Sequence, residues 1–219
     1  MSLWIKICGN TTLADAQLAV DAGADAVGFV FAPSPRRVTA EQVAAIAPQL
    51  PATVEKIGVF VDASLDEIVT TVRACGLTGV QLHSESGPEL TAALRERLGQ
   101  ELRLLRVVHF GADAAAQATA IAQDANVDAV LVDSRTAAAV GGTGITFDWT
   151  AAAETLFQNA KVRKHLIAAG GLSPANVTEA IAMLRPWGVD VVSGVEATPG
   201  RKDPAKVREF MVRARAANR

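Results

Sequence analysis

The sequence contains only two cysteines among its 219 residues, Cys8 and Cys75. Two cysteines cannot build a disulfide framework, and such sparing use suits a reducing cytosol. The opening segment MSLWIKIC lacks the long apolar stretch of a signal peptide, and the longest apolar runs have the length of β-strands. We therefore expect a cytoplasmic protein that does not span a membrane.

An excess of charge of one sign is also missing. Lys and Arg together number 21 and Asp and Glu 23, a formal net charge of -2. No basic run stands out beyond the arginines of the C-terminal tail, which argues against a nucleic-acid partner. The His, Cys and Asp residues nowhere show the spacing of metal ligands, so we expect no metal and no other cofactor.

Half of the residues are apolar and 20% are charged, which allows a large core and makes disorder unfavourable. Short apolar or β-branched runs recur about every 25 residues, the length of one βα unit, with Ala-rich helical stretches between them. These runs cover residues 4–8, 26–31, 56–61, 79–83, 103–110, 128–133, 165–169 and 189–194. Eight such units predict an α/β fold, a (β/α)8 TIM barrel that forms one catalytic domain over residues 1–219.

A doubly wound open sheet is the main alternative to the barrel. That fold more usually shows a G-x-G-x-x-G turn after its first strand, whereas CGNTTLADA stands there in this sequence. The ends of the expected helices are marked as well. Gly23 and Gly76 have the positions of left-handed C-caps, and Ser173 followed by Pro174 predicts an N-cap and the first helical residue. Capping-box spacing joins Thr39 to Gln42 and Ser64 to Glu67.

In a barrel of this kind, reactive groups project from the C-terminal ends of the strands. Gly170 and Gly171 follow the seventh expected strand, and Ser193 and Gly194 follow the eighth. Glycine lets backbone N–H groups approach an anion, and these two loops are the usual phosphate site of the fold. The glycines alternatively serve only to turn the chain, but their presence in both loops favours a phosphate site.

Cys8 ends the first expected strand on the same side as Lys6, whereas Ile5 and Ile7 form an apolar opposite face. Cys8 is therefore expected to point into the barrel. A neighbouring lysine or the phosphate-binding dipoles would lower the pKa of its thiol and provide a thiolate base. The alternative is a small hydrophobic core residue, which is how we interpret Cys75.

Other polar residues lie at or beyond strand ends. Asp133 closes the apolar run DAVLVD, where burial favours a protonated carboxyl group suited to a general acid; alternatively it is an N-cap or an ion-pair partner. Arg36 is either a fork for a carboxylate or phosphate or a solvated loop charge. His83 either bonds to substrate or holds a loop in place. Gly142 lies in GGTG, a candidate lid or second phosphate contact.

Several of these segments together resemble the phosphoribosylanthranilate isomerase family. The matching segments run in order through every βα unit except the fifth: KICGNT, GADAVGFVF, SPRRV, GVFV, GVQLHSE, GGTGITFDW, AAGGLSPANV and GVDVVSGVEATPGRKD. The resemblance implies an Amadori rearrangement in tryptophan biosynthesis. N-(5-phosphoribosyl)anthranilate would become 1-(2-carboxyphenylamino)-1-deoxyribulose 5-phosphate by general acid–base catalysis.

The resemblance also implies roles for individual residues. Cys8 would be the general base and Asp133 the general acid. Arg36 would hold the anthranilate carboxylate, with His83 and Gly142 as further substrate contacts. The remaining contacts would be Asp190 at the ribose hydroxyls and Gly171, Ser193 and Gly194 at the phosphate.

The sequence departs from the family at Asn10 and Val192, where apolar and small polar residues respectively are usual, and in QLHS and IAAGG. Three other functions remain possible. They are a different phosphosugar isomerase, epimerase or synthase on the same barrel, an enzyme that uses Cys8 as a nucleophile, and a catalytically silent phosphate-binding module. A histidine-pathway aminoaldose is not expected as a substrate, because an aspartate rather than Cys8 would then be expected. A monomer and a homodimer are both compatible with the sequence.

Overall fold

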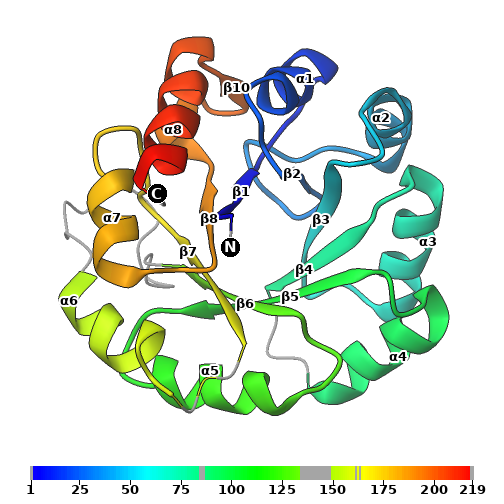
Figure 1. The fold of residues 1–219 in the computed structure, drawn as a ribbon. Coiled ribbons are helices and arrows are strands. Elements are labelled where there is room, and N and C mark those ends of the chain that lie inside the picture. The colour runs from blue at the N-terminus through cyan, green and yellow to red at the C-terminus, as the bar shows by residue number, and fades with distance from the viewer. Residues whose placement is uncertain (1, 84–86, 134–148, 161, 163, 218–219) are drawn as a thin grey trace.

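The computed structural model describes residues 2–83, 87–133, 149–160, 162 and 164–217. Its parallel strands form a closed barrel in the order β1 to β8, and the helices surround it (Figure 1). The strands are β1 (Trp4–Ile7), β2 (Ala26–Val30), β3 (Glu55–Val61), β4 (Gly79–His83), β5 (Arg103–His109), β6 (Ala129–Asp133), β7 (His165–Ala169) and β8 (Gly188–Val191). The predicted (β/α)8 barrel is confirmed.

The helices follow the strands in alternation. They are α1 (Leu13–Asp21), α2 (Ala40–Ile46), α3 (Leu65–Cys75), α4 (Pro88–Leu98), α5 (Ala114–Gln123), α6 (Trp149–Ala152), α7 (Val177–Leu184) and α8 (Pro204–Ala217). Both predicted capping boxes are present, at Thr39 and Ser64. Gly76 caps α3 with a φ of 62°, and Gly23, just past α1, has a φ of 91°.

The predicted start of the seventh helix at Ser173 is wrong. The N-cap of α7 is Asn176, three residues later. The Asn176 side chain accepts a hydrogen bond from the Ser173 N–H at 2.8 Å, and the Ser173 carbonyl accepts one from the Val177 N–H at 3.1 Å. These bonds close a turn over the residues that the Ser-Pro pattern assigned to the helix.

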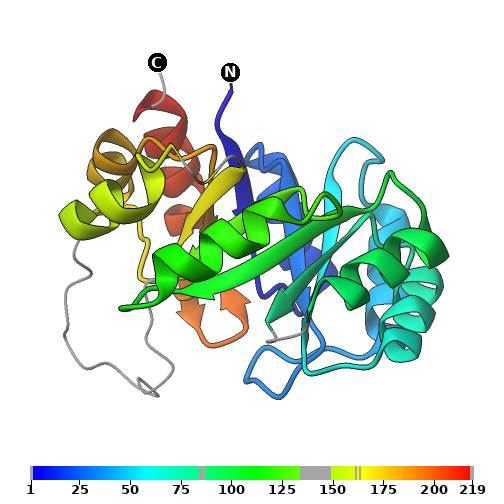
Figure 2. The ribbon, with the colours of Figure 1, turned by 90° about the horizontal axis from the view of Figure 1, so that it is seen from below.

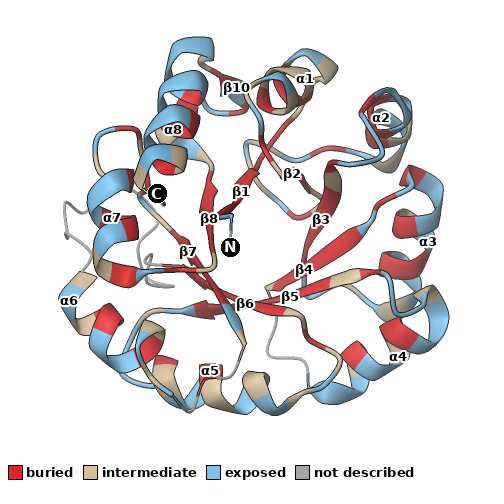
Figure 3. Ribbon diagram, in the orientation of Figure 1, coloured by how far each residue is buried: buried red, intermediate tan, exposed pale blue. Residues whose placement is uncertain are grey.

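The interior of the barrel changes character along its axis. Ile5 and Ile7 of β1 belong to the large core cluster that includes residues of the surrounding helices. In Figure 3 the strands are mostly buried, and the helices carry both buried and exposed residues. Inward-facing apolar side chains, among them Trp4, Leu105 and Ile167, form a separate cluster inside the barrel. Toward the C-terminal ends of the strands, the buried side chains include polar ones: Lys6, Gln81, Asp133 and Asp190.

Two further strands lie outside the barrel ladder. β9 (Glu196–Thr198) and β10 (Arg201–Lys202) form an antiparallel hairpin between β8 and α8. The hairpin lies at the C-terminal end of the barrel, opposite the N-terminus of the chain (Figure 2). Within the described ranges, no helix is long and apolar enough to cross a membrane.

Candidate active site

Cys8 lies one residue past β1 and is buried inside the barrel mouth. Its N–H donates to the Val191 carbonyl at 2.9 Å, which continues the ladder toward β8. On the other side, a Cβ atom at Gly28 would stand 2.4 Å from Cys8 Sγ. The neighbouring strand therefore needs glycine at position 28, because any side chain there would occupy the space of the thiol.

Lys6 lies beside the thiol and is fully buried. Its Nζ donates to Asp190 Oδ1 at 2.8 Å, and it lies close enough to Cys8 for each of the two groups to shift the pKa of the other. Burial disfavours the ammonium form, but the charges of Asp190 and Cys8 and the hydrogen bond to Asp190 together outweigh burial and raise the pKa of Lys6. Lys6 is therefore a buried cation whose charge acts on the Cys8 side chain.

The balance is different for Cys8. Burial raises the pKa of its thiol above the ordinary value, and the charges of Lys6 and Lys202 oppose that effect without overcoming it. The expectation that a neighbouring lysine would bring the Cys8 pKa below its ordinary value is wrong for this structure. The lysine does act in the predicted direction, but complete removal of the thiol from water has the larger effect.

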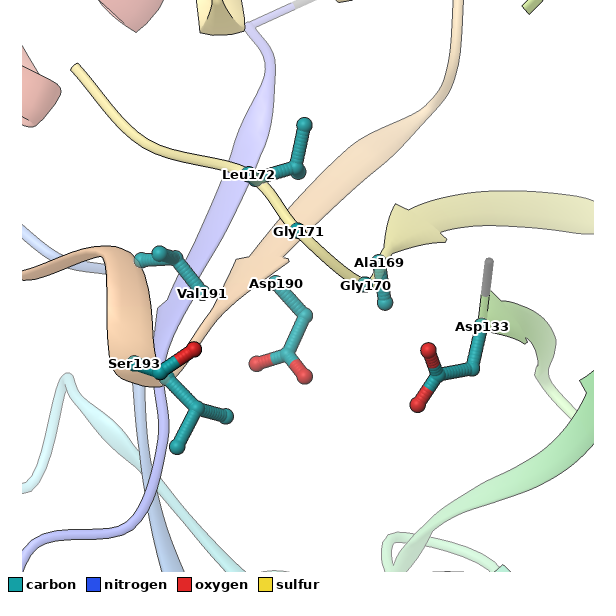
Figure 4. Close-up of a pocket in the computed structure, with 9 residues that line it drawn as sticks. Asp133, Ala169, Gly170, Gly171, Leu172, Asp190, Val191 and Ser193 are labelled. Atoms are coloured by element: carbon teal, nitrogen blue, oxygen red, sulfur yellow. The ribbon is translucent and has the colours of Figure 1, made fainter. Parts of the chain in front are cut away.

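Asp133 and Asp190 line a cleft at the C-terminal end of the barrel. Asp133 ends β6 and is buried, and Asp190 lies on β8, where Lys6 holds one of its carboxylate oxygens. The two carboxylates point toward the same opening (Figure 4). The cleft is completed by residues of the loops after β7 and β8: Ala169, Gly170, Gly171, Leu172, Val191, Val192 and Ser193.

The loops after β7 and β8 approach each other closely. Gly170 and Gly171 have φ angles of 81° and 66°, which favour glycine. A Cβ atom at Gly194 would lie 1.9 Å from the Leu172 carbonyl oxygen. Among the described residues, the N–H groups of Gly171, Ser193 and Gly194 make no hydrogen bond to a backbone carbonyl outside helices and strands. Such N–H groups beside a cleft are suited to an anion.

Arg36 forms a two-pronged ion pair with Glu196. Its Nε donates to Glu196 Oε1 at 2.8 Å, and its Nη2 to Oε2 at 2.6 Å. The Arg36 side chain is only 17% exposed, so the solvated-charge alternative is wrong. The two nitrogens expected to bind a ligand are therefore occupied by the protein's own carboxylate, and Nη1 makes no hydrogen bond to the described residues.

His83 is half-buried, and its Nε2 lies 2.9 Å from Gln81 Nε2 on the same strand. Its ring is tilted against that of His109 at a centroid distance of 5.9 Å. Gly142 and the GGTG segment lie outside the described residues. Within the residues that are described, no three His, Cys, Asp or Glu side chains gather in a way that could hold a metal ion.

Glu196 and Lys202 are site residues that the sequence reasoning missed. They face each other across the β9–β10 hairpin, and Lys202 Nζ donates to the Cys8 carbonyl at 2.6 Å. The turn signal Thr198-Pro199-Gly200 between them predicts such a hairpin, so this pairing was accessible from the sequence. Their contacts with Arg36 and Cys8 were not, because those residues are far away in the chain.

A comparison with protein families matches residues 5–213 to the family described as N-(5'phosphoribosyl)anthranilate (PRA) isomerase. The chain is 46% identical over 208 residues to N-(5'-phosphoribosyl)anthranilate isomerase of Pelobacter propionicus. The match covers 94% of this chain and 93% of that protein. Since both lengths are almost fully covered, the similarity extends over the whole barrel.

Solved structures show the same similarity. One is a phosphoribosyl anthranilate isomerase in complex with reduced 1-(o-carboxyphenylamino)-1-deoxyribulose 5-phosphate, with a TM-score of 0.83 and 35% identity over 98% of this chain and 99% of that one. Another is a crystal structure of monomers generated from the dimeric phosphoribosylanthranilate isomerase of Thermotoga maritima. Its TM-score is 0.81 and its identity 34%, over 97% of this chain and 98% of that one.

Proposed function

Because the chain belongs to the N-(5'-phosphoribosyl)anthranilate isomerase family of tryptophan biosynthesis, we propose that Cys8 and Asp133 carry out this isomerisation at the barrel mouth. The observation that carries the proposal is the placement of two proton-transfer groups at the same end of the barrel. Asp133 lines the cleft, and Cys8 lies next to Lys6, which holds the cleft residue Asp190. Cys8 follows β1 and Asp133 ends β6, with β7 and β8 between them on one side. A ligand whose phosphate is held by the loops after β7 and β8 would lie between the two groups.

The first step is protonation of the ribose ring oxygen by the carboxyl group of Asp133. The bond between C1 and the ring oxygen breaks, and the nitrogen lone pair forms a protonated Schiff base at C1. Asp133 is nearly completely buried at the end of β6. Its carboxyl group lines the cleft at the end of the barrel where the phosphate loops lie, within reach of a ligand held there.

The second step is removal of the C2 proton by the thiolate of Cys8. The electrons of the C2–H bond neutralise the Schiff base and give an enolamine, which becomes the aminoketose when C1 takes up a proton and O2 loses one. Lys6 supports this step because its positive charge lowers the pKa of Cys8 and so stabilises the thiolate against the effect of burial. The reaction moves protons only and leaves the overall oxidation state unchanged.

The remaining groups bind the substrate. We assign the phosphate to the N–H groups of Gly171, Ser193 and Gly194, and the anthranilate carboxylate to the Nη1 edge of Arg36. The second oxygen of Asp190 is assigned to a ribose hydroxyl. His83 and Gly142 are retained as further substrate contacts on the basis of the family resemblance.

Turnover of N-(5-phosphoribosyl)anthranilate by Cys8→Ala and Asp133→Asn variants tests these roles. We expect the parent to be active and each variant to lose at least about a hundredfold in kcat, as is typical when an acid or base is removed. Cys75→Ser is the matched control, because this second cysteine lies at the end of α3, away from the cleft.

If the parent is active and Cys8→Ala is equally active, Cys8 is not the base, and the family membership is unaffected. An inactive but folded parent would leave only the fold and a phosphate site. Covalent trapping of substrate on Cys8, detected by mass spectrometry, would instead favour the cysteine-nucleophile alternative.

We also propose that the only partner needed for catalysis is the small phosphosugar, because each assigned group comes from this chain. A monomer or a homodimer is compatible with that assignment, and sedimentation equilibrium distinguishes them. A cytoplasmic location follows from the proposed base, since a catalytic thiol must be protected from oxidation.

A further inference from the structure

Glu196 is more than a neighbour of Arg36, because it fixes the guanidinium group at two points. The two hydrogen bonds, of 2.8 and 2.6 Å, use both oxygens of the carboxylate. The side chain of Glu196 is 4% exposed. A third bond, from the Gly200 N–H to Glu196 Oε1 at 3.3 Å, ties the carboxylate to the turn of its own hairpin. Glu196 is therefore itself held in place.

Lys202 connects the same carboxylate to the strand that carries the catalytic thiol. Its Nζ lies 3.4 Å from Glu196 Oε1 and donates to the Cys8 carbonyl at 2.6 Å and to the Val192 carbonyl at 3.3 Å. The Lys202 side chain is 0% exposed. The hairpin thus joins Arg36 from the second βα unit to Cys8 from the first.

The stem of Arg36 is held on the other side by Gly9. A Cβ atom at Gly9 would stand 2.9 Å from Arg36 Cδ and 3.1 Å from Val192 Cγ1. Val192 also lines the cleft. The Arg36 side chain therefore passes over the backbone at Gly9, the residue after Cys8, and close to Val192 at the proposed substrate site.

The Glu196 carboxylate lies between two basic side chains, Arg36 and Lys202. Burial acts against ionisation of Glu196, but the hydrogen bonds from Arg36 and the Gly200 N–H and the charges of Arg36 and Lys202 together outweigh it and lower the Glu196 pKa. One carboxylate then faces the two basic side chains of Arg36 and Lys202. A carboxylate supplied by a ligand would complete a second ion pair.

We propose that Glu196 is a positioning residue that holds the Arg36 guanidinium group so that Nη1 faces the anthranilate carboxylate. Lys202, bonded to both Glu196 and the Cys8 carbonyl, sets the distance between the guanidinium group and Cys8. The proposal rests on the function proposed above. A long arginine side chain loses rotamer freedom when it binds, and holding it in advance removes that loss from the binding step. The competing hypothesis is that Glu196 weakens ligand binding, because its carboxylate occupies guanidinium nitrogens that the ligand would otherwise bind.

Glu196→Gln separates the two roles, because it removes the charge and keeps the shape. Two probes are compared by calorimetry: reduced 1-(2-carboxyphenylamino)-1-deoxyribulose 5-phosphate and the same compound without its carboxyl group. We expect the variant to bind the first probe about tenfold more weakly and the second unchanged. In turnover, KM should rise by about tenfold while kcat changes by less than about threefold.

Glu55→Gln is the matched control. Glu55 also holds an arginine at two points, Arg103, with distances of 2.8 and 3.3 Å, but both residues begin their strands at the opposite end of the barrel. This variant should bind both probes like the parent. If Glu196→Gln fails to fold, Glu196→Asp keeps the charge on a shorter side chain and should show the same loss for the carboxylate-bearing probe.

Equal or tighter binding of the carboxylate-bearing probe by Glu196→Gln would overturn the positioning role, as would an equal loss for both probes. If the parent turns over the substrate in those cases, the proposed function stands without Glu196. A folded parent without turnover refutes the proposed function first, and the role of Glu196 falls with it.

Discussion

At the scale of the residue, the Lys6–Asp190 pair is explained better by the role proposed for Cys8 than by stability. A buried ion pair often contributes little or nothing to stability, because removing both charges from water offsets their attraction. Here Lys6 is hydrogen-bonded to Asp190, and its charge acts on the Cys8 thiol. The cation opposes the effect of burial on Cys8, and Asp190 keeps Lys6 in its charged form.

Lys6→Met should therefore move the pH profile of kcat/KM toward higher pH. Burial already raises the pKa of the Cys8 thiol, and Lys6 lowers it again in part. Removing the cation raises the Cys8 pKa further, so less thiolate is present at any given pH and the rise in activity occurs at higher pH. Thiolate absorbance at 240 nm in a Cys75→Ser background measures the same shift directly.

Lys56→Met provides the control for this shift. Lys56 is also a buried lysine, but its Nζ donates to the Pro51 carbonyl, and it does not contribute to the Cys8 pKa. Its pH profile should match that of the parent. An unshifted profile in folded Lys6→Met would show that Lys6 does not influence the base.

At the scale of the element, the phosphate site depends on the contact between two loops. The loop after β7 contains two glycines, Gly170 and Gly171, with left-handed backbone conformations. The turn after β8 passes so close to Leu172 that position 194 has no room for a side chain. Asn176 holds the first loop by donating to the Gly171 carbonyl at 3.0 Å. The N–H groups proposed for phosphate are thus positioned by the packing of one loop on the other.

Gly194→Ala should separate these loops. The added methyl group would stand 1.9 Å from the Leu172 carbonyl oxygen, so backbone must move. We expect KM to rise by at least about tenfold and the free energy of unfolding to fall by about 1–3 kcal/mol, as in other overpacked sites. Steady-state kinetics and urea unfolding measure the two effects. Gly111→Ala, where the added methyl group would meet nothing within 4 Å, should leave both unchanged.

At the scale of the whole molecule, the last helix holds the beginning of the barrel. Arg215 on α8 donates to Asp25 Oδ2 at 2.8 Å, to the Gly23 carbonyl at 2.9 Å, and also to the Leu3 carbonyl. Asp25 Oδ2 in turn accepts from the Ile5 N–H at 2.7 Å. These bonds join the C-terminal helix to β1 and to the turn before β2.

Arg215→Ala should lower the free energy of unfolding by about 1–2 kcal/mol, because a charged donor to several acceptors is lost from a partly exposed site. Urea unfolding measures this change, and activity should stay that of the parent. Arg213→Ala is the control on the same helix. Its half-exposed pair with Glu209 should contribute less than about 0.5 kcal/mol. Equal stability of the two variants would contradict the proposed role of Arg215.

Local regularities determined much of this protein from the sequence alone. The period of strands and helices predicted the barrel, and the capping boxes at Thr39 and Ser64 predicted two helix starts. Alternation along the first strand placed Cys8 on the side of Lys6. These features depend on neighbours a few residues apart, so a short segment contains the information.

Only the tertiary structure decided the electrostatics of the site. Arg36 and Glu196 are separated by 160 positions, and Lys6 and Asp190 by 184. The direction of the Cys8 pKa depends on how completely the closed barrel excludes water from the thiol, which outweighs the lysine that the sequence identified. Sequence periodicity specifies the direction in which a side chain points. The charge it meets there, and the amount of water left around it, are set by closure of the barrel, because closure brings distant strands together.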